Sequence, residues 1–165
     1  MASHRLILLC PELRRFAETT RYNYHFFASG KNAMGVNLMM ETHYVRLGGD
    51  EIVRKLADRF YDLMHLDPDF HGVRKLHSPD LTGSRNKLYW FLSGWLGGPP
   101  LYTDRFGHPA LRRRHLPFAI GMIERDQWMA CMERAMEDLG VEVTLKTELI
   151  AAFFKTADFM RNKTD

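Results

Sequence analysis

The sequence predicts an all-α protein, and three observations lead to that prediction. Apolar residues recur at spacings of three and four in several segments after residue 48, which is the spacing of one face of an α-helix. Glycine and proline interrupt these segments where helices would end. No segment alternates apolar and polar residues for the length of a strand. A sheet is therefore not required.

The first two patterned segments are long enough for helices of several turns. One begins near Asp50, a residue type that caps helices, and ends at Asp67-Pro68; its apolar stripe consists of Val53, Ala57, Phe60, Tyr61 and Met64. The other follows Asp80, a second candidate cap, and stops at Gly97-Gly98-Pro99-Pro100. Its inner face would contain Leu81, Ser84, Leu88, Phe91 or Leu92, and Trp95.

The remaining chain predicts one short helix and two long ones. A loop through Tyr102 and Gly107 leads to Pro109, which suits the first position of a short helix that contains Leu111 to His115. A long helix is expected from about Glu124 to Leu139, ended by Gly140, and the last is expected to be capped by Thr144. Their inner faces would contain Trp128, Cys131 or Met132, Ala135, Leu139, Leu145, Leu149, Phe153, Ala157 and Met160.

The sequence predicts an N-terminal extension over residues 1–44, followed by one globular domain over residues 45–165. The chain has 165 residues, of which 45% are apolar and 26% charged, values ordinary for a folded protein. The 23 basic and 20 acidic residues give a formal net charge of +3. Residues 1–44 contain five of the basic and three of the acidic residues, so the body has 18 basic and 17 acidic residues. A nearly neutral body argues against nucleic acid as a partner. No apolar run reaches the about 18 residues of a membrane span.

The extension shows no targeting signal. Only five apolar residues, Leu6–Cys10, precede Pro11, where a secretory core needs about 7 to 15. Leu9 also stands where a lipoprotein signal has a small residue. The stretch from Thr19 has no clear period and is expected to be weakly structured, and Met39 or Met40 could be the translation start. With two cysteines in the chain, we expect a reducing compartment, the cytoplasm.

Several kinds of chemical site are excluded or weak. The sequence has no G-x-S-x-G elbow and no glycine-rich phosphate loop. His108 and His115 are two helical turns apart and could share a zinc ion, but no cysteine or carboxylate completes the site. Arg112-Arg113-Arg114 suits a local clamp for one or two anionic groups. Tyr61 and Trp128 lie on apolar helix faces, so their O–H and N–H groups need either backbone carbonyls or a polar ligand.

The stretch Gly97–Phe118, GGPPLYTDRFGHPALRRRHLPF, followed by ERDQWMACM at Glu124–Met132, resembles the signature of group II truncated haemoglobins. The resemblance covers about residues 45–160. It implies a two-over-two helical sandwich that encloses haem b.

The resemblance also implies roles for single residues. His115 matches the proximal iron ligand, and Tyr61 and Trp128 match the distal donors to a bound ligand. The remaining distal positions match Phe60, Ser84, Leu88 and His77, although a shift of one residue in the loop would select Leu76 instead of His77. The implied cofactor contacts are Lys87, Arg112, Arg114 and Tyr102, of which the basic ones would pair with propionates or else be solvated surface charges.

Three functions follow as hypotheses. The first is binding of oxygen and related diatomic gases, nitric oxide and carbon monoxide, at a five-coordinate iron in a polar pocket; strong donors would make release too slow for oxygen delivery. The alternative is a haem redox enzyme, a nitric-oxide dioxygenase or a peroxidase-like enzyme, which needs an unidentified reductase because this chain has no flavin segment. The third is a helical binding module without haem.

Overall fold

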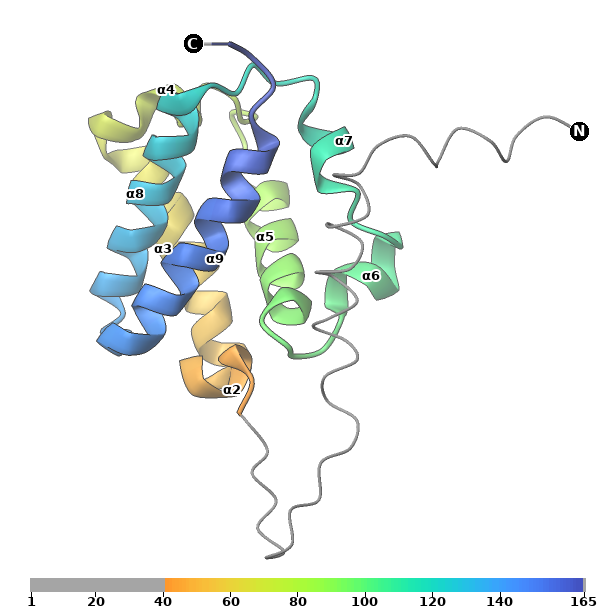
Figure 1. Ribbon diagram of the computed structural model, residues 1–165, viewed down its shortest axis with the longest axis vertical. Helices are drawn as coiled ribbons and strands as arrows, with labels where there is room; N and C mark the ends of the chain where they lie inside the picture. Colours follow the sequence, from red (N-terminus) through yellow and green to blue (C-terminus); the bar gives the residue numbers. More distant parts are fainter. Residues whose placement is uncertain (1–40, 165) are drawn as a thin grey trace, which may run out of the picture. The chain divides into compact units, whose positions relative to one another are not determined.

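The computed structural model describes residues 41–164, and over that range the regular structure is helical throughout. The predictions for residues 1–40 lie outside the described residues. The helices are α2 (His43–Leu47), α3 (Gly49–Leu66), η1 (Pro68–Phe70), α4 (His71–Arg74), α5 (Thr82–Trp95), α6 (Leu101–Phe106), α7 (Leu111–His115), α8 (Met122–Asp138) and α9 (Val143–Met160) (Figure 1). The all-α prediction is confirmed.

The four long helices form two packed pairs. Helix α3 packs on α5, α8 packs on α9, and α3 also contacts α8, so the pairs are stacked as two layers (Figure 1). The short helices attach to this frame: α4 packs on α8, α6 on α5, and α7 on α9. This arrangement is the two-over-two sandwich that the resemblance implies.

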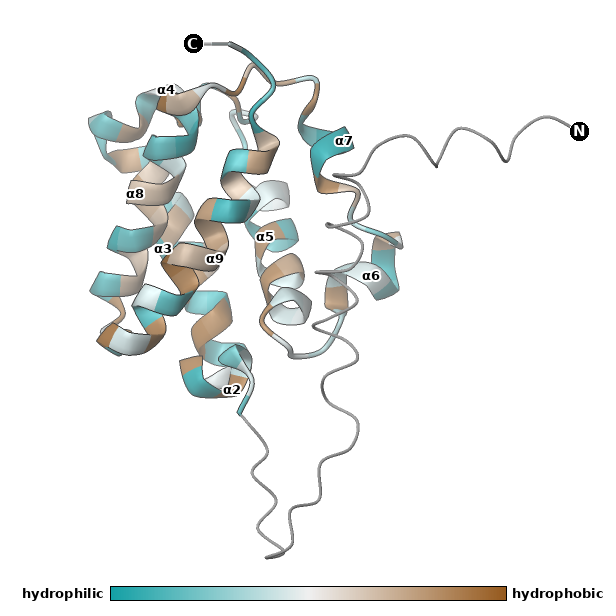
Figure 2. Cartoon of the chain, in the orientation of Figure 1, coloured by the Kyte–Doolittle hydropathy of each residue, from teal (hydrophilic) through white to brown (hydrophobic). Residues whose placement is uncertain are grey.

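The core lies where the apolar stripes of α3, α8 and α9 meet (Figure 2). The stripe predicted for α3 is buried at every position, and Met132 and Ala135 of α8 and Leu149 of α9 are fully buried as well. Burial of each large apolar side chain contributes about 1.5 to 3 kcal/mol. Periodicity therefore located the core correctly, because these helices are long enough to show it.

Two of the predicted helix caps are wrong. Helix α3 begins at Gly49, and the Asp50 carboxylate accepts a hydrogen bond from the Tyr89 hydroxyl at 2.6 Å instead of capping the helix. Helix α9 is capped by Glu142, whose carboxylate accepts from the backbone N–H groups of Thr144 (2.7 Å) and Leu145 (2.9 Å). At α3 the N-cap position is Gly48, which makes no side-chain cap, whereas at α9 the Glu142 carboxylate reaches the free N–H groups in place of the predicted Thr144.

The predicted loop through Tyr102 is also wrong, because residues 101–106 form α6. Pro109 does not open α7, which starts at Leu111 after Ala110 in the left-handed region, with φ 45°. Helices of four to six residues are too short to show a hydrophobic period, so sequence reasoning missed α2, α4 and α6.

Helix α2 is tied to the body at several points. Leu47 is buried, the backbone N–H of Tyr44 donates to the Leu96 carbonyl at 2.9 Å, and the Arg46 guanidinium pairs with the Glu148 carboxylate of α9 at 2.5 Å. It begins at His43, within the range that the sequence assigns to the extension.

A chain that starts at Met40 is expected to melt within a few degrees of the full chain, because it keeps α2 and all its contacts. A chain that starts at Gly48 loses the burial of Leu47, worth about 1.5 to 3 kcal/mol, and should melt about 5 °C lower or more. Thermal melts followed by circular dichroism compare the three chains. Equal losses in both shortened chains would mean that residues 1–39 stabilise the body.

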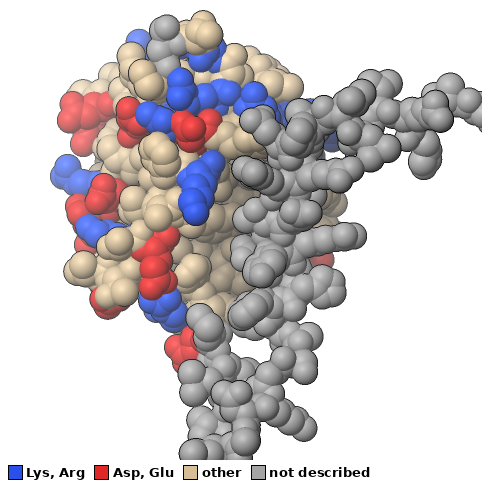
Figure 3. Space-filling model, in the orientation of Figure 1, with Lys and Arg blue, Asp and Glu red and all other residues tan. Residues whose placement is uncertain are grey.

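Charged side chains of both signs are interspersed over the visible face of the described body rather than gathered in one basic patch (Figure 3). Some charged side chains of the described body form ion pairs, such as Lys146 with Glu137 at 2.7 Å. Within residues 41–164, no helix combines the length and apolarity needed to cross a membrane.

Candidate functional site

His115, the last residue of α7, has a half-buried imidazole whose Nδ1 lies 2.7 Å from the Leu111 carbonyl oxygen, one turn earlier. A carbonyl oxygen only accepts hydrogen bonds, so Nδ1 carries the proton of the neutral ring and Nε2 keeps its lone pair. None of the residues at 41–164 is hydrogen-bonded to Nε2. The imidazole is therefore held in the tautomer that binds a metal through Nε2.

Asn162, which follows α9, holds the end of α7 and was missed by sequence reasoning. Its side-chain amide donates to the carbonyl oxygens of His115 (3.0 Å) and Phe118 (2.7 Å), and its amide oxygen accepts from the backbone N–H of Ile120 (3.1 Å). A lone polar residue after the last helix gives no signal in the sequence. These three bonds, the Asn162 clamp, fix the backbone that carries His115.

His108 takes part in the turn before α7 and not in a metal site. Its Nδ1 accepts a hydrogen bond from the Ala110 N–H at 3.0 Å. In the part of the chain that the structure describes, no group of three His, Cys, Asp or Glu side chains is placed to hold a metal ion. A zinc ion shared by His108 and His115 would find no third protein ligand here.

Tyr61 of α3 is buried, with 6% of its surface exposed. Burial raises the pKa of its hydroxyl above the ordinary value, and the hydrogen bond with Ser84 lowers the pKa less than burial raises it. The hydroxyl therefore stays protonated at all physiological pH values and can donate a hydrogen bond. Its ring packs edge-on against Phe60, with centroids 5.1 Å apart.

Trp128 of α8 lies on the other side of Phe60, with ring centroids 5.3 Å apart, and it also contacts Phe153 of α9 at 5.8 Å. Its indole is half-buried, and no hydrogen bond joins its N–H to another described residue. The structure thus brings Phe60, Tyr61 and Trp128 together as the resemblance implies, and the indole N–H is available to a ligand.

His77 follows α4, and its ring centroid lies 5.6 Å from that of Tyr61. Burial is the main cause that lowers the pKa of His77, and the charges of Arg74 and His115 lower it further against the hydrogen bond with Val73. Nδ1 lies 2.9 Å from the Val73 carbonyl oxygen, so in the neutral ring Nε2 is an acceptor. At neutral pH, His77 can accept from the Tyr61 hydroxyl but cannot donate to a ligand through Nε2.

Helix α5 supplies three of the predicted site residues. Ser84 is half-buried and bonded to Tyr61, and Leu88, also half-buried, packs against the core four residues later. Lys87 is exposed and has no charged or hydrogen-bonding partner among residues 41–164. Its ammonium group can therefore pair with an anion at the edge of the site.

The other three predicted cofactor contacts have different surroundings. The Arg112 guanidinium donates to the carbonyl oxygens of Phe159 and, at 3.0 Å, Arg161, so it joins α7 to the end of α9. Arg114 is exposed, and its Nε donates to the Pro109 carbonyl at 3.0 Å. Tyr102 is buried on α6. Of these residues, Arg114 has the guanidinium most available for an outside anion.

Gln127, next to Trp128, positions the segment that carries His77. Its side-chain oxygen accepts from the backbone N–H of Val73 at 2.8 Å. A Cβ at Gly72 would lie 2.4 Å from this oxygen, so only glycine leaves room for the bond. The sequence gives no hint of this contact, because the two residues are more than fifty positions apart.

These residues fit the haem that the resemblance implies. A haem iron in a globin needs one neutral imidazole from the protein, since the porphyrin supplies four nitrogens, and the neutral imidazole of His115 would suit this position. The aromatic and aliphatic side chains of Phe60, Trp128 and Leu88 suit the apolar ring, and the exposed Lys87 and Arg114 suit its carboxylates. The residue types present therefore fit one haem.

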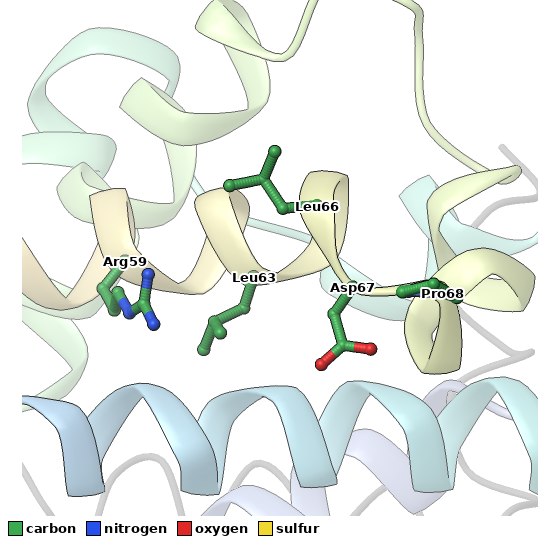
Figure 4. Close-up of a pocket in the computed structure, with 5 residues that line it drawn as sticks. All are labelled: Arg59, Leu63, Leu66, Asp67 and Pro68. Atoms are coloured by element: carbon green, nitrogen blue, oxygen red, sulfur yellow. The ribbon is translucent and has the colours of Figure 1, made fainter.

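A shallow pocket elsewhere on the surface contains none of the candidate site residues. It lies beside the end of α3, where side chains of that helix face α8, and its lining consists of Arg59, Leu63, Leu66, Asp67 and Pro68 (Figure 4). Arg59 there is paired with Asp138 at 2.6 Å. The pocket offers no free charged group that points to a ligand.

Comparison with known proteins places the chain among the globins. The family model described as bacterial-like globin matches residues 42–162. Group 2 truncated hemoglobin YjbI of Bacillus subtilis is 39% identical over 117 residues, which are 71% of this chain and 86% of that protein.

Solved structures show the same similarity. The group II 2-on-2 hemoglobin from Agrobacterium tumefaciens is 41% identical, with a TM-score of 0.74 over 78% of this chain and 99% of that one. The truncated oxygen-avid haemoglobin from Bacillus subtilis is 38% identical, with a TM-score of 0.68 over 74% of this chain and all of that one.

Proposed function

Because the chain belongs to the bacterial-like globin family and, within it, to the group II truncated haemoglobins, we propose that it binds haem b through His115 and holds oxygen or a related diatomic gas on the opposite side. The observation that carries this proposal is the hydrogen bond from His115 Nδ1 to the Leu111 carbonyl. That bond leaves Nε2 unprotonated, as an iron ligand must be. Similarity to a haemoglobin from Bacillus subtilis that is described as oxygen-avid supports the same ligand here.

When bound, haem supplies a ferrous iron to which a diatomic gas can bind reversibly. The residues of this chain decide how strongly the gas is held. Bound oxygen acquires partial negative charge, so donors in a dry pocket stabilise it. The Tyr61 hydroxyl and the Trp128 indole N–H are the two donors that stay protonated at neutral pH. Ser84 and Leu88, small and apolar, would leave an open path to the pocket.

The iron is proposed to be five-coordinate before a gas binds. Among the described residues near Tyr61, His77 has an imidazole nitrogen, Nε2, that could compete for the iron. Its neighbour Tyr61 is a hydrogen-bond donor at close range, with ring centroids 5.6 Å apart. In the gas-free protein Nε2 is proposed to accept from that hydroxyl, whose single proton would turn to the gas when one binds. Lys87, Arg112 and Arg114 are proposed to hold the propionates, and the buried ring of Tyr102 is proposed to line the apolar edge of the haem.

The cellular setting is part of the proposal. Cys131, a buried thiol that donates to the Phe60 carbonyl at 3.2 Å, has its pKa raised to about 12 by burial and is suited to a reducing compartment. Because the chain has two cysteines and no disulfide framework, we propose that the protein works in a reducing compartment, the cytoplasm. A reductase from outside this chain would be needed to keep the iron ferrous, and nitric oxide and carbon monoxide are further ligands that the same pocket would accept.

The absorption spectrum of the purified protein tests this function. One haem per chain and a strong Soret band are expected, and the dithionite-reduced protein should show the single broad visible band of five-coordinate iron. A spectrum without a Soret band after expression with added haem would overturn the proposal. A split six-coordinate visible spectrum that reverts in His77→Leu would instead show that His77 is a second ligand and overturn the five-coordinate assignment.

A further inference from the structure

The ring contacts among the described residues continue from the candidate site to the surface. Starting at Trp128, neighbouring rings touch in the order Phe153, Trp95, Phe91, Tyr102, Phe106 and Trp90. Consecutive centroids are 5.8, 4.7, 6.4, 6.5, 5.0 and 5.7 Å apart. The series crosses from α8 through α9 and α5 to α6 and back to α5 (Figure 1).

The order of ring types in this series is regular. Each oxidisable ring, Trp or Tyr, is separated from the next by one phenylalanine. The closest step is the stack of Phe153 on Trp95, with an angle of 12° between the rings. The rate of electron tunnelling falls steeply with distance, so several short steps between oxidisable rings are faster than one long step. We propose that Trp128, Trp95 and Trp90 form a relay that carries electrons from a surface donor to the haem site.

Tyr102 is a bridge in this relay and not a stopping point. Oxidation of a phenol requires loss of its proton, and Tyr102 is buried with no hydrogen-bond acceptor for its hydroxyl among the described residues. A tryptophan can lose an electron and keep its proton. Trp95 and Trp90 also lie on the same helix, five residues apart, which is about 7.5 Å along its axis. The three tryptophans therefore carry the electron, and the rings between them shorten the gaps.

The outer end of the relay is open to a small anionic donor. Phe106, next to Trp90, is 44% exposed, and the exposed Arg105 holds its guanidinium 4.8 Å from the Trp90 ring centroid. The positive charge attracts anions to this point of the surface. Ascorbate, an anionic one-electron donor, is the probe that matches it.

The reaction rests on the proposed haem binding and is peroxidase-like. Hydrogen peroxide, the oxidant, gains two electrons and two protons at the haem and becomes two molecules of water. Two ascorbate monoanions each lose one electron and one proton and become radical anions, while the protons reach peroxide through solvent. For each of the two electrons, every tryptophan of the relay would give one electron inward and regain one from its outer neighbour, which for Trp90 is ascorbate, so the protein is unchanged after a turnover.

Spin trapping on the haem-loaded full chain tests the relay. After addition of hydrogen peroxide without ascorbate, 5,5-dimethyl-1-pyrroline N-oxide should form an adduct on Trp90, identified by mass spectrometry of tryptic peptides. Trp95→Phe keeps an aromatic ring on Phe153 but removes the central oxidisable one, so the adduct on Trp90 should be lost. Ascorbate oxidation should fall to the rate of Trp90→Phe, and adducts on Tyr61 or Trp128 should persist.

Tyr89→Phe is the matched control, because Tyr89 neighbours Trp90 on α5 but contacts none of the relay rings; it should leave the Trp90 adduct unchanged. Soret absorbance and circular dichroism verify that each variant folds and holds haem. An adduct on Trp90 that survives Trp95→Phe, or a wild-type protein with adducts only at Tyr61 and Trp128, overturns the relay while haem binding stands. A wild-type chain that binds no haem overturns the proposed function, and the relay with it.

Discussion

Replacement of His115 by alanine is expected to release haem at least about tenfold faster than the wild-type protein, the equivalent of about 1.4 kcal/mol or more in the affinity. His115 is the proposed protein ligand of the iron, and no second imidazole on α7 can replace it. The helices should remain, because the buried stripes of α3, α8 and α9 do not involve this side chain. Transfer of haem to apomyoglobin measures the rate, and far-ultraviolet circular dichroism measures the helix content.

His65→Ala is the matched control, because His65 is exposed near the end of α3 and lies outside the candidate site. It should retain haem normally. Imidazole added to His115→Gly should restore a wild-type-like ferrous spectrum by filling the vacated position. If His115→Ala keeps both its haem and an unchanged ferrous spectrum, the iron ligand is another residue.

Removal of both distal donors is expected to have the other large effect. A hydrogen bond to a charged group contributes about 1.5 to 3 kcal/mol, so loss of a sole donor raises the oxygen dissociation rate by about ten- to a hundredfold. Tyr61→Phe alone should raise the rate by less than that range, because the Trp128 N–H remains and can take over. Tyr61→Phe with Trp128→Phe should raise it by more than the product of the two single effects.

Stopped-flow mixing of the oxygen complex with dithionite or carbon monoxide measures these rates. The comparison is best made at pH 8, because the lowered pKa of His77 keeps its ring neutral there and prevents it from donating through Nε2. Tyr44→Phe controls for the loss of a phenol, since the Tyr44 hydroxyl faces Asp50 at 3.5 Å and not the pocket. A double variant with the wild-type rate would show that neither side chain holds the ligand.

Below the lowered pKa of His77, the same ring becomes a donor at both nitrogens. Its folded-state pKa lies below the ordinary value, so protonation begins only at acidic pH. The hydrogen bond to the Val73 carbonyl keeps the proton of the neutral His77 ring on Nδ1. Nε2 therefore accepts a hydrogen bond while the ring is neutral and donates one only after the ring is protonated.

The parts of this protein that the sequence predicts well are those governed by repetition or by a continuous motif. Helix α3 has enough turns for its stripe at Val53, Ala57 and Met64 to repeat. His115 and Trp128 are embedded in two nearly adjacent stretches that resemble one family throughout. Local spacing and local resemblance need no knowledge of the tertiary structure.

The parts that the sequence does not predict depend on contacts between distant residues. Gln127 meets the N–H of Val73, and Asn162 meets the carbonyl of His115, across 54 and 47 positions of the chain. Helix α9 is capped by Glu142 rather than Thr144, because the Glu142 carboxylate lies close enough to accept from the N–H groups of Thr144 and Leu145. The residue type alone does not show which side chain will do so. Such bonds become visible only when the helices are packed.

The Asn162 clamp makes the backbone at His115 depend on residues that come after the last helix. A protease that removes Asn162, or a purification tag that pulls this segment away from α7, would break all three of these hydrogen bonds. Such handling would loosen the proximal side of the pocket without touching the pocket itself. An affinity tag for this protein therefore belongs at the other end, and batches that differ in carboxy-terminal processing are expected to differ in how firmly they keep their haem.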